Sequence, residues 1–330
     1  MTEPLLSIEN LEIRFGDMAV VEDLSLRIEA GETLAVVGES GCGKSITGLS
    51  LMGLLPPQAR VAGGRAVFDG QDLAALDEAA MTRLRGTSLS MIFQEPVLSL
   101  DPTMRVGRQV AEALQQHRPI SGAAAAERTL LMFEAVGIPE PRARMRQYPH
   151  ELSGGMCQRV MIAMALICSP RLLIADEPTT ALDVTIQAQI LDLIGRMRRE
   201  TGTAVLLITH DMGVVAEVAD RVAVMYAGRI VETAPVAELF RQPRHPYTHL
   251  LLRTIPRVGG PRKTPLPAIA GSVPDLSQWT GGCRFHPRCP LADARCKGET
   301  PPLVPAPDAP GHRAACWHSD RLIARPEALA

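Results

Sequence analysis

The sequence lacks the features of a membrane-spanning, exported or nucleic-acid-binding chain. Its longest apolar stretch covers about residues 160–168, and a bilayer span needs about 20 residues. The first residues contain acids early and no basic region ahead of an apolar core, so a secretory signal is not expected. The formal net charge of −2 at pH 7 is also not that of a chain built mainly to hold nucleic acid.

Repeats and low-complexity tracts are not apparent either. With 330 residues, of which 46% are hydrophobic, the chain can bury a substantial core. This length suggests one large domain with an appendage, or two modest domains.

Runs typical of buried strands alternate with helical patterns along most of the chain. This alternation predicts an α/β fold with a mostly parallel core sheet. The expected strands are residues 6–15, 24–28, 33–37, 172–175, 204–209 and 222–226. The expected helices of this core are residues 46–52, 160–167 and 186–199.

Two segments depart from this pattern. Amphipathic helices with frequent alanine, as in the run 123–126, predict an inserted helical subdomain at about residues 96–165. Beyond residue 243 prolines recur and regular periodicity fades, which predicts a loop-rich C-terminal extension. We therefore expect a main domain over residues 1–240 and an extension over 241–330.

The segment GESGCGKS is the most specific local pattern. Gly38, Gly43, Lys44 and Ser45 fit G-x-x-x-x-G-K-[ST], with a strand before the pattern and a helix after it. Such a loop turns backbone N–H groups toward anionic oxygens, and the helix N-terminus adds its positive end. The lysine then reaches the β- and γ-phosphates, and the serine hydroxyl binds Mg²⁺.

The candidate phosphate-binding residues are Gly38, Glu39, Ser40, Gly41, Cys42, Gly43, Lys44 and Ser45. The alternative is a flexible surface turn.

Two acids end the buried run LLIADEP. Asp176 is placed to hold the Mg²⁺ shell, and Glu177 to polarise an attacking water. Helix capping by Asp176 is the plainer alternative, and the phosphate loop in the same chain argues against it.

In order and spacing, GESGCGKS, LSGGMCQ and LLIADEP resemble the motifs of ATP-binding-cassette (ABC) ATPases, over about residues 5–239. The resemblance implies the P-loop NTPase cassette fold with an N-terminal antiparallel β subdomain. It also implies the use of ATP and Mg²⁺, and roles for further residues. Phe15 resembles the aromatic residue that stacks on adenine. Gln94 resembles the glutamine that contacts Mg²⁺ and water. His210 resembles the switch histidine. The signature residues are Ser153, Gly154 and Gly155, and Asp183 resembles the D-loop aspartate.

The resemblance also implies partners. Ser153 and its glycines act on ATP held by an opposite cassette, so two cassettes pack head to tail. We expect the second cassette to be a distinct homologue. Two integral membrane permease subunits supply the pore, and a solute-binding protein takes part indirectly. The chain is expected as a peripheral protein on the cytoplasmic face of the bacterial inner membrane.

The segment HPYTHLLL at residues 245–252 and the cysteine-containing tail are similar to oligopeptide and dipeptide importer ATPases. The resemblance therefore favours peptides as solute, with nickel or glutathione as alternatives. Cys157 stands where a basic or polar residue is expected, which leaves the Ser-Gly-Gly backbone intact.

Four cysteines of seven lie in the last fifty residues with the spacing C-x₅-C-x₆-C-x₁₉-C. In the expected reducing compartment, metal binding competes well with disulfides. The spacing is not the paired C-x₂-C of common zinc sites. The peptide-importer resemblance associates Cys283, Cys289, Cys296 and Cys316 with a [4Fe–4S] cluster. Zinc, free thiols and oxidised pairs stay open, and His286 and His318 are expected at the surface.

Cys42 lies at a helix N-terminus, where a thiolate is favoured. We favour the plainer interpretation, a small residue that merely fits.

Two other classes of function fit the sequence less well. A soluble ABC ATPase of translation or DNA repair generally has two cassettes or long coiled coils, and neither is seen here. In a small-molecule kinase, the LSGG signature and His210 would have no purpose.

Overall fold

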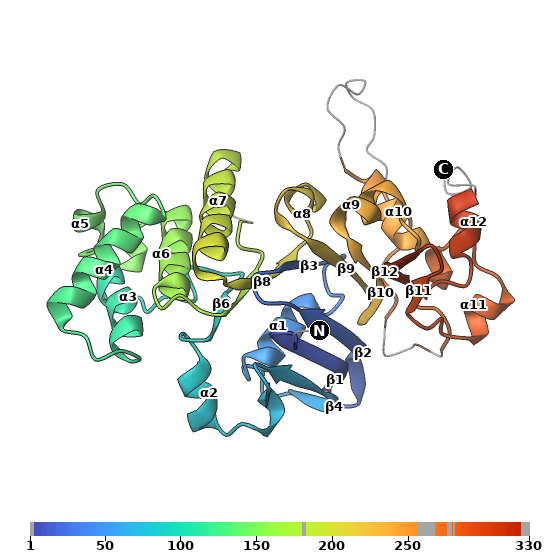
Figure 1. Cartoon of the computed structure of the whole chain (residues 1–330), viewed down its shortest axis with the longest axis horizontal. Helices are drawn as coiled ribbons and strands as arrows, with labels where there is room; N and C mark the ends of the chain where they lie inside the picture. Colours follow the sequence, from blue (N-terminus) through green and yellow to red (C-terminus); the bar gives the residue numbers. More distant parts are fainter. Residues whose placement is uncertain (1–2, 180–182, 256–267, 276–278, 280, 325–330) are drawn as a thin grey trace.

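The computed structural model describes residues 3–179, 183–255, 268–275, 279 and 281–324. Its centre is an eight-stranded sheet in the order β11-β12-β10-β9-β3-β8-β7-β6 (Figure 1). Neighbouring strands from β9 to β6 are parallel. They are β9 (Arg221–Tyr226), β3 (Thr33–Val37), β8 (Ala204–Thr209), β7 (Leu172–Asp176) and β6 (Leu89–Ile92). The antiparallel strands at the other end are β10 (Arg229–Pro235), β12 (Ala309–Ala314) and β11 (Val304–Ala306).

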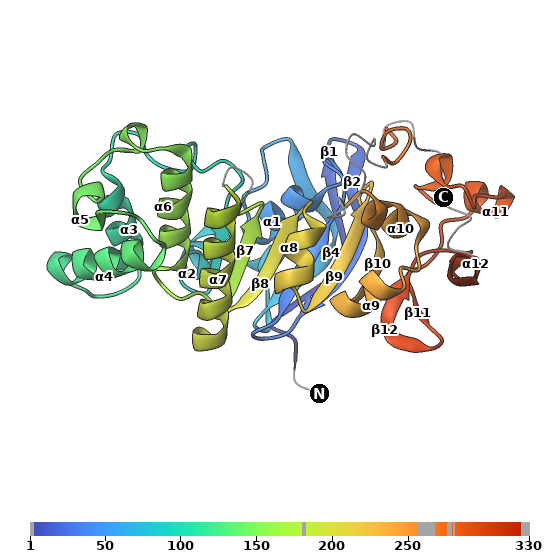
Figure 2. The same ribbon diagram turned by 90° about the horizontal axis from the view of Figure 1, so that it is seen from above.

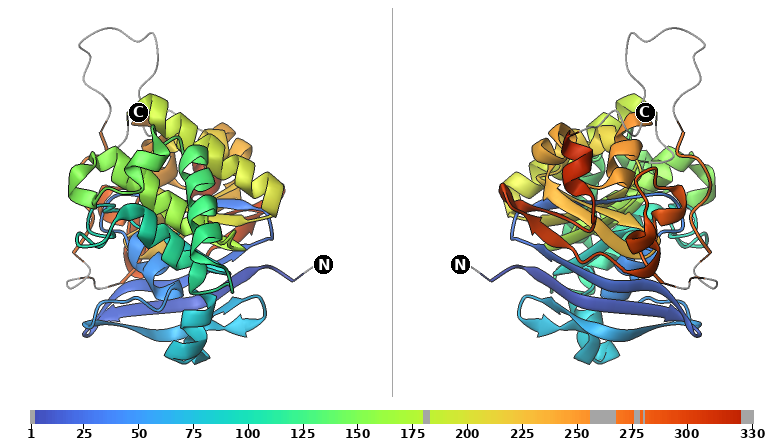
Figure 3. Two further views of the ribbon diagram at one scale, coloured as in Figure 1. Left: turned by 90° about the vertical axis from the view of Figure 1, so that its left-hand side faces the viewer. Right: turned by 90° about the vertical axis from the view of Figure 1, so that its right-hand side faces the viewer.

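A second, antiparallel sheet lies against one face of the core sheet (Figure 3). Its strands, in spatial order, are β2 (Met18–Ile28), β1 (Leu6–Phe15), β4 (Ala59–Phe68) and β5 (Gln71–Asp72). Helix α1 (Lys44–Leu51) contributes to the core between the two sheets. Because side chains alternate along a strand, Leu34 and Val36 of β3 enter this core, whereas Ala35 and Val37 enter the core on the opposite face.

Helices cover that opposite face (Figure 2). They are α7 (Val184–Thr201), α8 (Met212–Val218), α9 (Val236–Arg241) and α10 (Pro246–Arg253). Helix α7 ends at Gly202, whose left-handed conformation is typical of a helix C-terminus. Among the described residues, no helix combines the length and the apolar character needed to cross a membrane.

A helical region extends from the core at the edge near β6 (green, left in Figure 1). It contains α3 (Val106–Gln115), α4 (Gly122–Ala135), α5 (Pro141–Arg144), the short η2 (Pro149–Glu151) and α6 (Gly154–Leu166). In α3 the residues Val106, Val110 and Leu114 recur every four positions and are fully buried, as in an amphipathic helix. Between β5 and β6, the chain forms η1 (Leu73–Ala75) and α2 (Glu78–Leu84).

The C-terminal extension contains regular structure as well as loops. It forms α10, η4 (His286–Arg288), α11 (Ala294–Gly298), β11, β12 and α12 (Ser319–Ala324). Strand β12 pairs with β10, with Glu232 opposite Ala314 and Thr233 opposite Arg313. The extension therefore continues the core sheet of the main domain, which its proline-rich sequence did not indicate.

A buried carboxylate fastens this extension. Glu232 of β10 has no exposed surface, and its Oε1 accepts hydrogen bonds from the backbone N–H of Arg244 and from His312 Nε2, both at 2.6 Å. Its Oε2 accepts from the backbone N–H of His245 at 2.9 Å. The Glu232 side chain therefore joins three parts of the chain, which are β10, the segment 244–245 and β12.

We predict that Glu232→Ala lowers the free energy of unfolding by about 3 kcal/mol, because three buried donors lose their acceptor. Urea denaturation followed by circular dichroism measures the change. Glu200→Ala, at an exposed position on α7, is the control and should shift stability by less than about 0.5 kcal/mol. Equal effects of the two substitutions would show that Glu232 does not fasten the extension.

Candidate functional site

The predicted residues converge because parallel strands end at one edge of the sheet. The phosphate loop follows β3, Gln94 follows β6, Asp176 ends β7 with Glu177 directly after it, and His210 follows β8. In open α/β sheets, ligands bind beyond the carboxyl ends of the strands. The fold therefore places these motifs, far apart in the sequence, around one location.

Glycine is required at two positions of the phosphate loop. Gly38 has φ +155°, and a Cβ there would lie 2.1 Å from the carbonyl oxygen of Met225. Gly43 has φ +102°, and its Cβ would lie 2.8 Å from Met225 Cε and 3.0 Å from Val21 Cγ2. Because α1 begins directly after Gly43, the first N–H groups of that helix adjoin the loop.

Lys44 is buried, and its ammonium group lies across the loop. Nζ donates to the carbonyl oxygens of Gly38 at 2.8 Å and Glu39 at 3.0 Å. The positive charge is thus held among the backbone groups that form an anion cradle.

Ser45 and Asp176 meet beside the loop. Ser45 Oγ donates to Asp176 Oδ1 at 3.0 Å, and Asp176 is only 3% exposed. Burial raises the pKa of Asp176, whereas the bond from Ser45 and the charge of Lys44 act in the opposite direction. A hydroxyl and a carboxylate fit a hard divalent cation such as Mg²⁺.

Glu177 connects two strand ends. Its Oε1 lies 3.0 Å from His210 Nδ1, and its Oε2 accepts from Gln94 Nε2 at 3.4 Å. The Glu177 backbone has φ +48°, a left-handed conformation that is uncommon outside glycine, and its N–H donates to the Ile208 carbonyl at 2.8 Å. The Glu177 side chain is 11% exposed and that of His210 59%. The two other predicted catalytic side chains, Gln94 and His210, therefore both contact Glu177.

The signature and D-loop residues lie at helix starts. Ser153 caps α6 by accepting from the N–H of Met156 at 3.4 Å, and Asp183 caps α7 by accepting from the N–H of Ile186 at 3.0 Å. Ser153, Gly154 and Asp183 are exposed, and Gly155 is half-buried. Phe15 ends β1 and is half-buried. Their contacts with nucleotide stay predictions.

The chain matches two family models. Residues 21–180 match the ABC transporter family, and residues 231–296 match the C-terminal region of oligopeptide/dipeptide transporters. A probable peptide ABC transporter ATP-binding protein of Sinorhizobium fredii is 52% identical over 97% of this chain and 96% of its own length. The dipeptide transport ATP-binding protein DppD of Bacillus subtilis is 50% identical over 97% of this chain and 96% of its own length. The oligopeptide transport ATP-binding protein OppD of Escherichia coli is 49% identical over 96% of this chain and 93% of its own length.

The chain belongs to the ABC transporter ATP-binding proteins. It is therefore an ATPase that couples hydrolysis to transport, with the predicted cassette fold. Solved structures agree: the ATP-binding cassette MJ0796 in a dimeric post-hydrolysis state with ADP and Pi has a TM-score of 0.64 at 26% identity, covering 70% of this chain and 98% of that one. CbiO1 of Clostridium perfringens has a TM-score of 0.63 at 27% identity, covering 73% and 92%.

Cys42 of the ATPase fits the interpretation of a small, packed residue. Its side chain is fully buried, and burial raises the pKa of the thiol more than the charge of Lys44 lowers it. Its Sγ would lie 3.0 Å from a Cβ at Gly38.

The four cysteines of the extension influence one another. Burial first, and then the neighbouring thiols, raise the pKa of Cys316 to about 12 and of Cys289 to about 11. The same causes raise the pKa of Cys283, with Cys296 as the neighbour. In the described chain all seven cysteines are free thiols. The thiols of Cys283, Cys289 and Cys296 are therefore neighbours of Cys316.

One group of possible metal ligands in this region includes Cys296. Ligand atoms of Asp293, Cys296 and His318 lie within 4.8 Å of one another. We expected His318 at the surface, but its side chain is only 11% exposed, and its Nε2 lies 3.0 Å from Asp293 Oδ2. His286 is half-buried and its Nδ1 lies 2.9 Å from the Cys283 carbonyl oxygen.

Sequence reasoning missed the contacts made to the phosphate loop by the extension. The hydroxyl of Tyr247 accepts from the Glu39 N–H at 2.9 Å, and Arg288 pairs with the Glu39 carboxylate. Tyr247 lies in HPYTHLLL, which served only as a mark of family resemblance. Arg288 directly precedes Cys289 but belongs to no recognised pattern.

We predict that Glu177→Gln binds ATP with near-normal affinity but hydrolyses it at least 100-fold more slowly, because the amide cannot polarise water as a carboxylate does. Equilibrium ATP binding and phosphate release measure the two effects. Gln115→Glu, at an exposed position at the end of α3, controls for an acid–amide exchange and should leave both unchanged. Turnover by Glu177→Gln at the wild-type rate would remove Glu177 from this role.

Proposed function

We propose that the chain is the ATP-hydrolysing subunit of an importer of di- and oligopeptides. The main support is sequence similarity: the chain is 49–52% identical, over nearly its whole length, to proteins named for peptide, dipeptide and oligopeptide transport. The match of residues 231–296 to the oligopeptide/dipeptide C-terminal region supports the same solute. None of these names favours nickel, glutathione or a kinase reaction.

The ATP site works by positioning and charge neutralisation. The loop N–H groups and Lys44 hold the phosphates, and Ser45 and Asp176, together with Gln94, hold Mg²⁺. When bound, Mg²⁺ neutralises charge on the phosphate oxygens. Glu177 polarises the attacking water, and His210, 3.0 Å from Glu177, orders the water and the γ-phosphate.

A second cassette completes the site. Ser153 and Gly154 are exposed at the start of α6, where backbone N–H groups favour an anion. We propose that these residues and Gly155 close over ATP held by the partner, with Asp183 at the same interface. The similarity to the MJ0796 cassette, which is dimeric in its post-hydrolysis state with ADP and Pi, supports this arrangement. The preferred partner is a distinct homologous ATPase.

The remaining partners are two integral membrane permease subunits, reached on the cytoplasmic face of the bacterial inner membrane. A solute-binding protein delivers the peptide to the permeases. The names of the relatives, which are ATP-binding proteins of transporters, support this assignment.

We also propose that Cys283, Cys289, Cys296 and Cys316 hold a [4Fe–4S] cluster. Four thiols that interact electrostatically are the right donor set and ligand number. Their raised pKa values mean that a metal must displace protons in order to bind. The Asp293, Cys296 and His318 set is the competing site, with the mixed ligands of a single zinc ion.

The function is tested on the native assembly. We predict that a tagged chain, purified from detergent-solubilised membranes, brings two integral membrane proteins and a second cassette, identified by mass spectrometry. In proteoliposomes with its binding protein, this assembly should accumulate labelled dipeptide only with ATP. Unlabelled peptides should compete, whereas nickel and glutathione should not.

The assembly carrying Glu177→Gln is the control, because it should have the same composition and accumulate no peptide. Isolation without any integral membrane protein would contradict the transport role. Uptake of nickel or glutathione in place of peptide would contradict the proposed solute.

The metal proposal gives a separate prediction. Anaerobically purified protein should be brown and contain about four irons per chain, and Cys316→Ser should lose most of this iron and the visible absorption. Asp293→Asn and His318→Gln should keep both, since neither residue is a cluster ligand. A colourless, iron-free protein, or one whose metal is zinc and depends on His318, would overturn the cluster.

A further inference from the structure

A segment of the C-terminal extension contacts the phosphate loop directly. The guanidinium of Arg288 donates to both carboxylate oxygens of Glu39, from Nη1 at 2.6 Å and from Nη2 at 2.9 Å. The Arg288 side chain is 5% exposed, and that of Glu39 27%. Because the pair is bidentate and largely buried, it fixes the orientation of the Glu39 side chain as well as its position.

The rest of the guanidinium is held by the extension and the core sheet. Nε donates to the Ala270 carbonyl at 2.8 Å, Nη2 to the Ile269 carbonyl at 3.2 Å, and Nη1 to the Tyr226 hydroxyl at 3.3 Å. Arg288 is therefore a fixed group, and Glu39 is the part of the loop that it holds.

Glu39 is held on its backbone as well. Its N–H donates to the hydroxyl of Tyr247, a fully buried residue of α10, and its carbonyl oxygen accepts from Lys44 Nζ. The side chain of Glu39 is thus fixed by the extension, and its carbonyl is fixed by the lysine that reaches the phosphates. A change in the orientation of Glu39 would also move Lys44.

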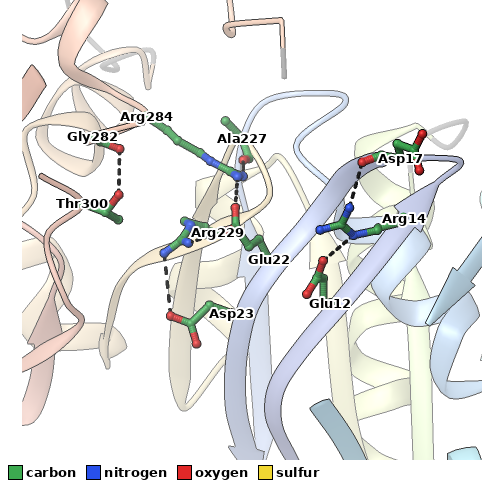
Figure 4. A network of polar contacts seen from close by, with 10 residues as sticks. All are labelled: Glu12, Arg14, Asp17, Glu22, Asp23, Ala227, Arg229, Gly282, Arg284 and Thr300. Atoms are coloured by element: carbon green, nitrogen blue, oxygen red, sulfur yellow. Dashed lines mark hydrogen bonds and ion pairs between the residues drawn. The ribbon is translucent and has the colours of Figure 1, made fainter. Parts of the chain in front are cut away.

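A second arginine fastens the same segment. Arg284 donates to the carbonyl oxygen of Ala227 and to the carboxylate of Glu22, which Arg229 also contacts at 2.8 Å (Figure 4). Between the two arginines, Phe285 is buried against the rings of Tyr226 and Tyr247, with centroids 5.2 and 5.5 Å away. Residues 284–288 are therefore anchored to the cassette at both ends and in the middle.

We infer that Arg288 is a positioning residue for ATP binding, acting through Glu39 on the phosphate loop. A loop already held in its binding conformation loses less conformational entropy when it closes on phosphate. Arg288 has no contact with the reacting atoms, so its loss should weaken binding and leave the chemical step intact. The inference rests on ATP binding alone and not on the transported solute or on the metal of the cysteines.

The test measures ATP affinity and turnover separately on the purified full-length chain. Arg288→Gln should raise the Kd for a fluorescent ATP analogue about tenfold, as expected when one charge-assisted pair is lost. The KM should rise in parallel, and kcat should stay within about twofold of wild type. Arg288→Lys keeps the charge but not the bidentate geometry, so its Kd should lie between those of the wild type and Arg288→Gln.

The chain offers a matched control in Arg244. This residue is 4% exposed and makes a bidentate pair with Asp308, both bonds at 2.7 Å, also within the extension. Both Arg244→Gln and Arg288→Gln should lower the melting temperature, but Arg244→Gln should leave the Kd for ATP unchanged. A similar loss of ATP affinity in Arg244→Gln would reduce the effect to general destabilisation and overturn the inference.

A double-mutant cycle identifies the route. If Arg288 acts through Glu39, then Arg288→Gln should add little to the Kd of Glu39→Gln, because the pair is already broken. Full additivity, or a wild-type Kd in folded Arg288→Gln, would refute the positioning role. Should Arg288→Gln fail to fold, the same comparisons apply to Arg288→Lys.

Discussion

The chemistry depends on a phosphate loop whose backbone is held by close packing against β9, β2 and the turn after β9. Gly38 leaves no room for a side chain beside the carbonyl of Met225, and Gly43 leaves none beside Met225 and Val21. From the same turn, the N–H of Gly228 donates to the carbonyl of Cys42 at 2.9 Å. Donors that are already oriented need no reorganisation when charge arrives. The shape of the loop is therefore a property of the sheet around it.

The carboxyl edge of the sheet gives the site its second property, which is communication between strands. Glu177 contacts residues at the ends of both β6 and β8. One of these residues, Gln94, lies by the edge strand next to the helical region, and the other, His210, lies before α8. Both are exposed, whereas Glu177 between them is largely buried.

Local pattern predicted the strands and the loop well where neighbours in sequence determine the outcome. The runs 33–37 and 204–209 are fully buried strands with the predicted bounds. Strand β4 was missed because Gly63 and Gly64 interrupt it, and Gly64, at φ +76°, lies at a bulge where a Cβ would meet the Asn10 carbonyl. Strand β12 was missed for a different reason: its partner β10 is distant in the sequence, and the contact between His312 and Glu232 joins residues 80 positions apart.

The site residues divide in the same way. Motifs identified the loop, Asp176, Glu177 and His210, which lie at or after strands that the pattern marks. Gln94 was identified by the family resemblance alone, because β6 before it was not predicted as a strand. The pair of Glu39 and Arg288, 249 residues apart, is formed only by tertiary packing, and no local signal marks it. For Cys42 the local argument counted the helix N-terminus, which lowers a thiol pKa, but could not count the burial that raises it.

The boundary predicted at residue 240 separates segments that share one packing unit. Glu232 lies before the boundary, whereas all three of its donors lie after it. The ring of Tyr226, also before the boundary, packs against Tyr247 and Phe285 beyond it. A chain ending at residue 240 would leave a buried carboxylate without donors and an aromatic cluster without its partners, each unfavourable in water. The extension is thus better described as the last layer of the cassette, and its contacts with Glu39 follow from that placement.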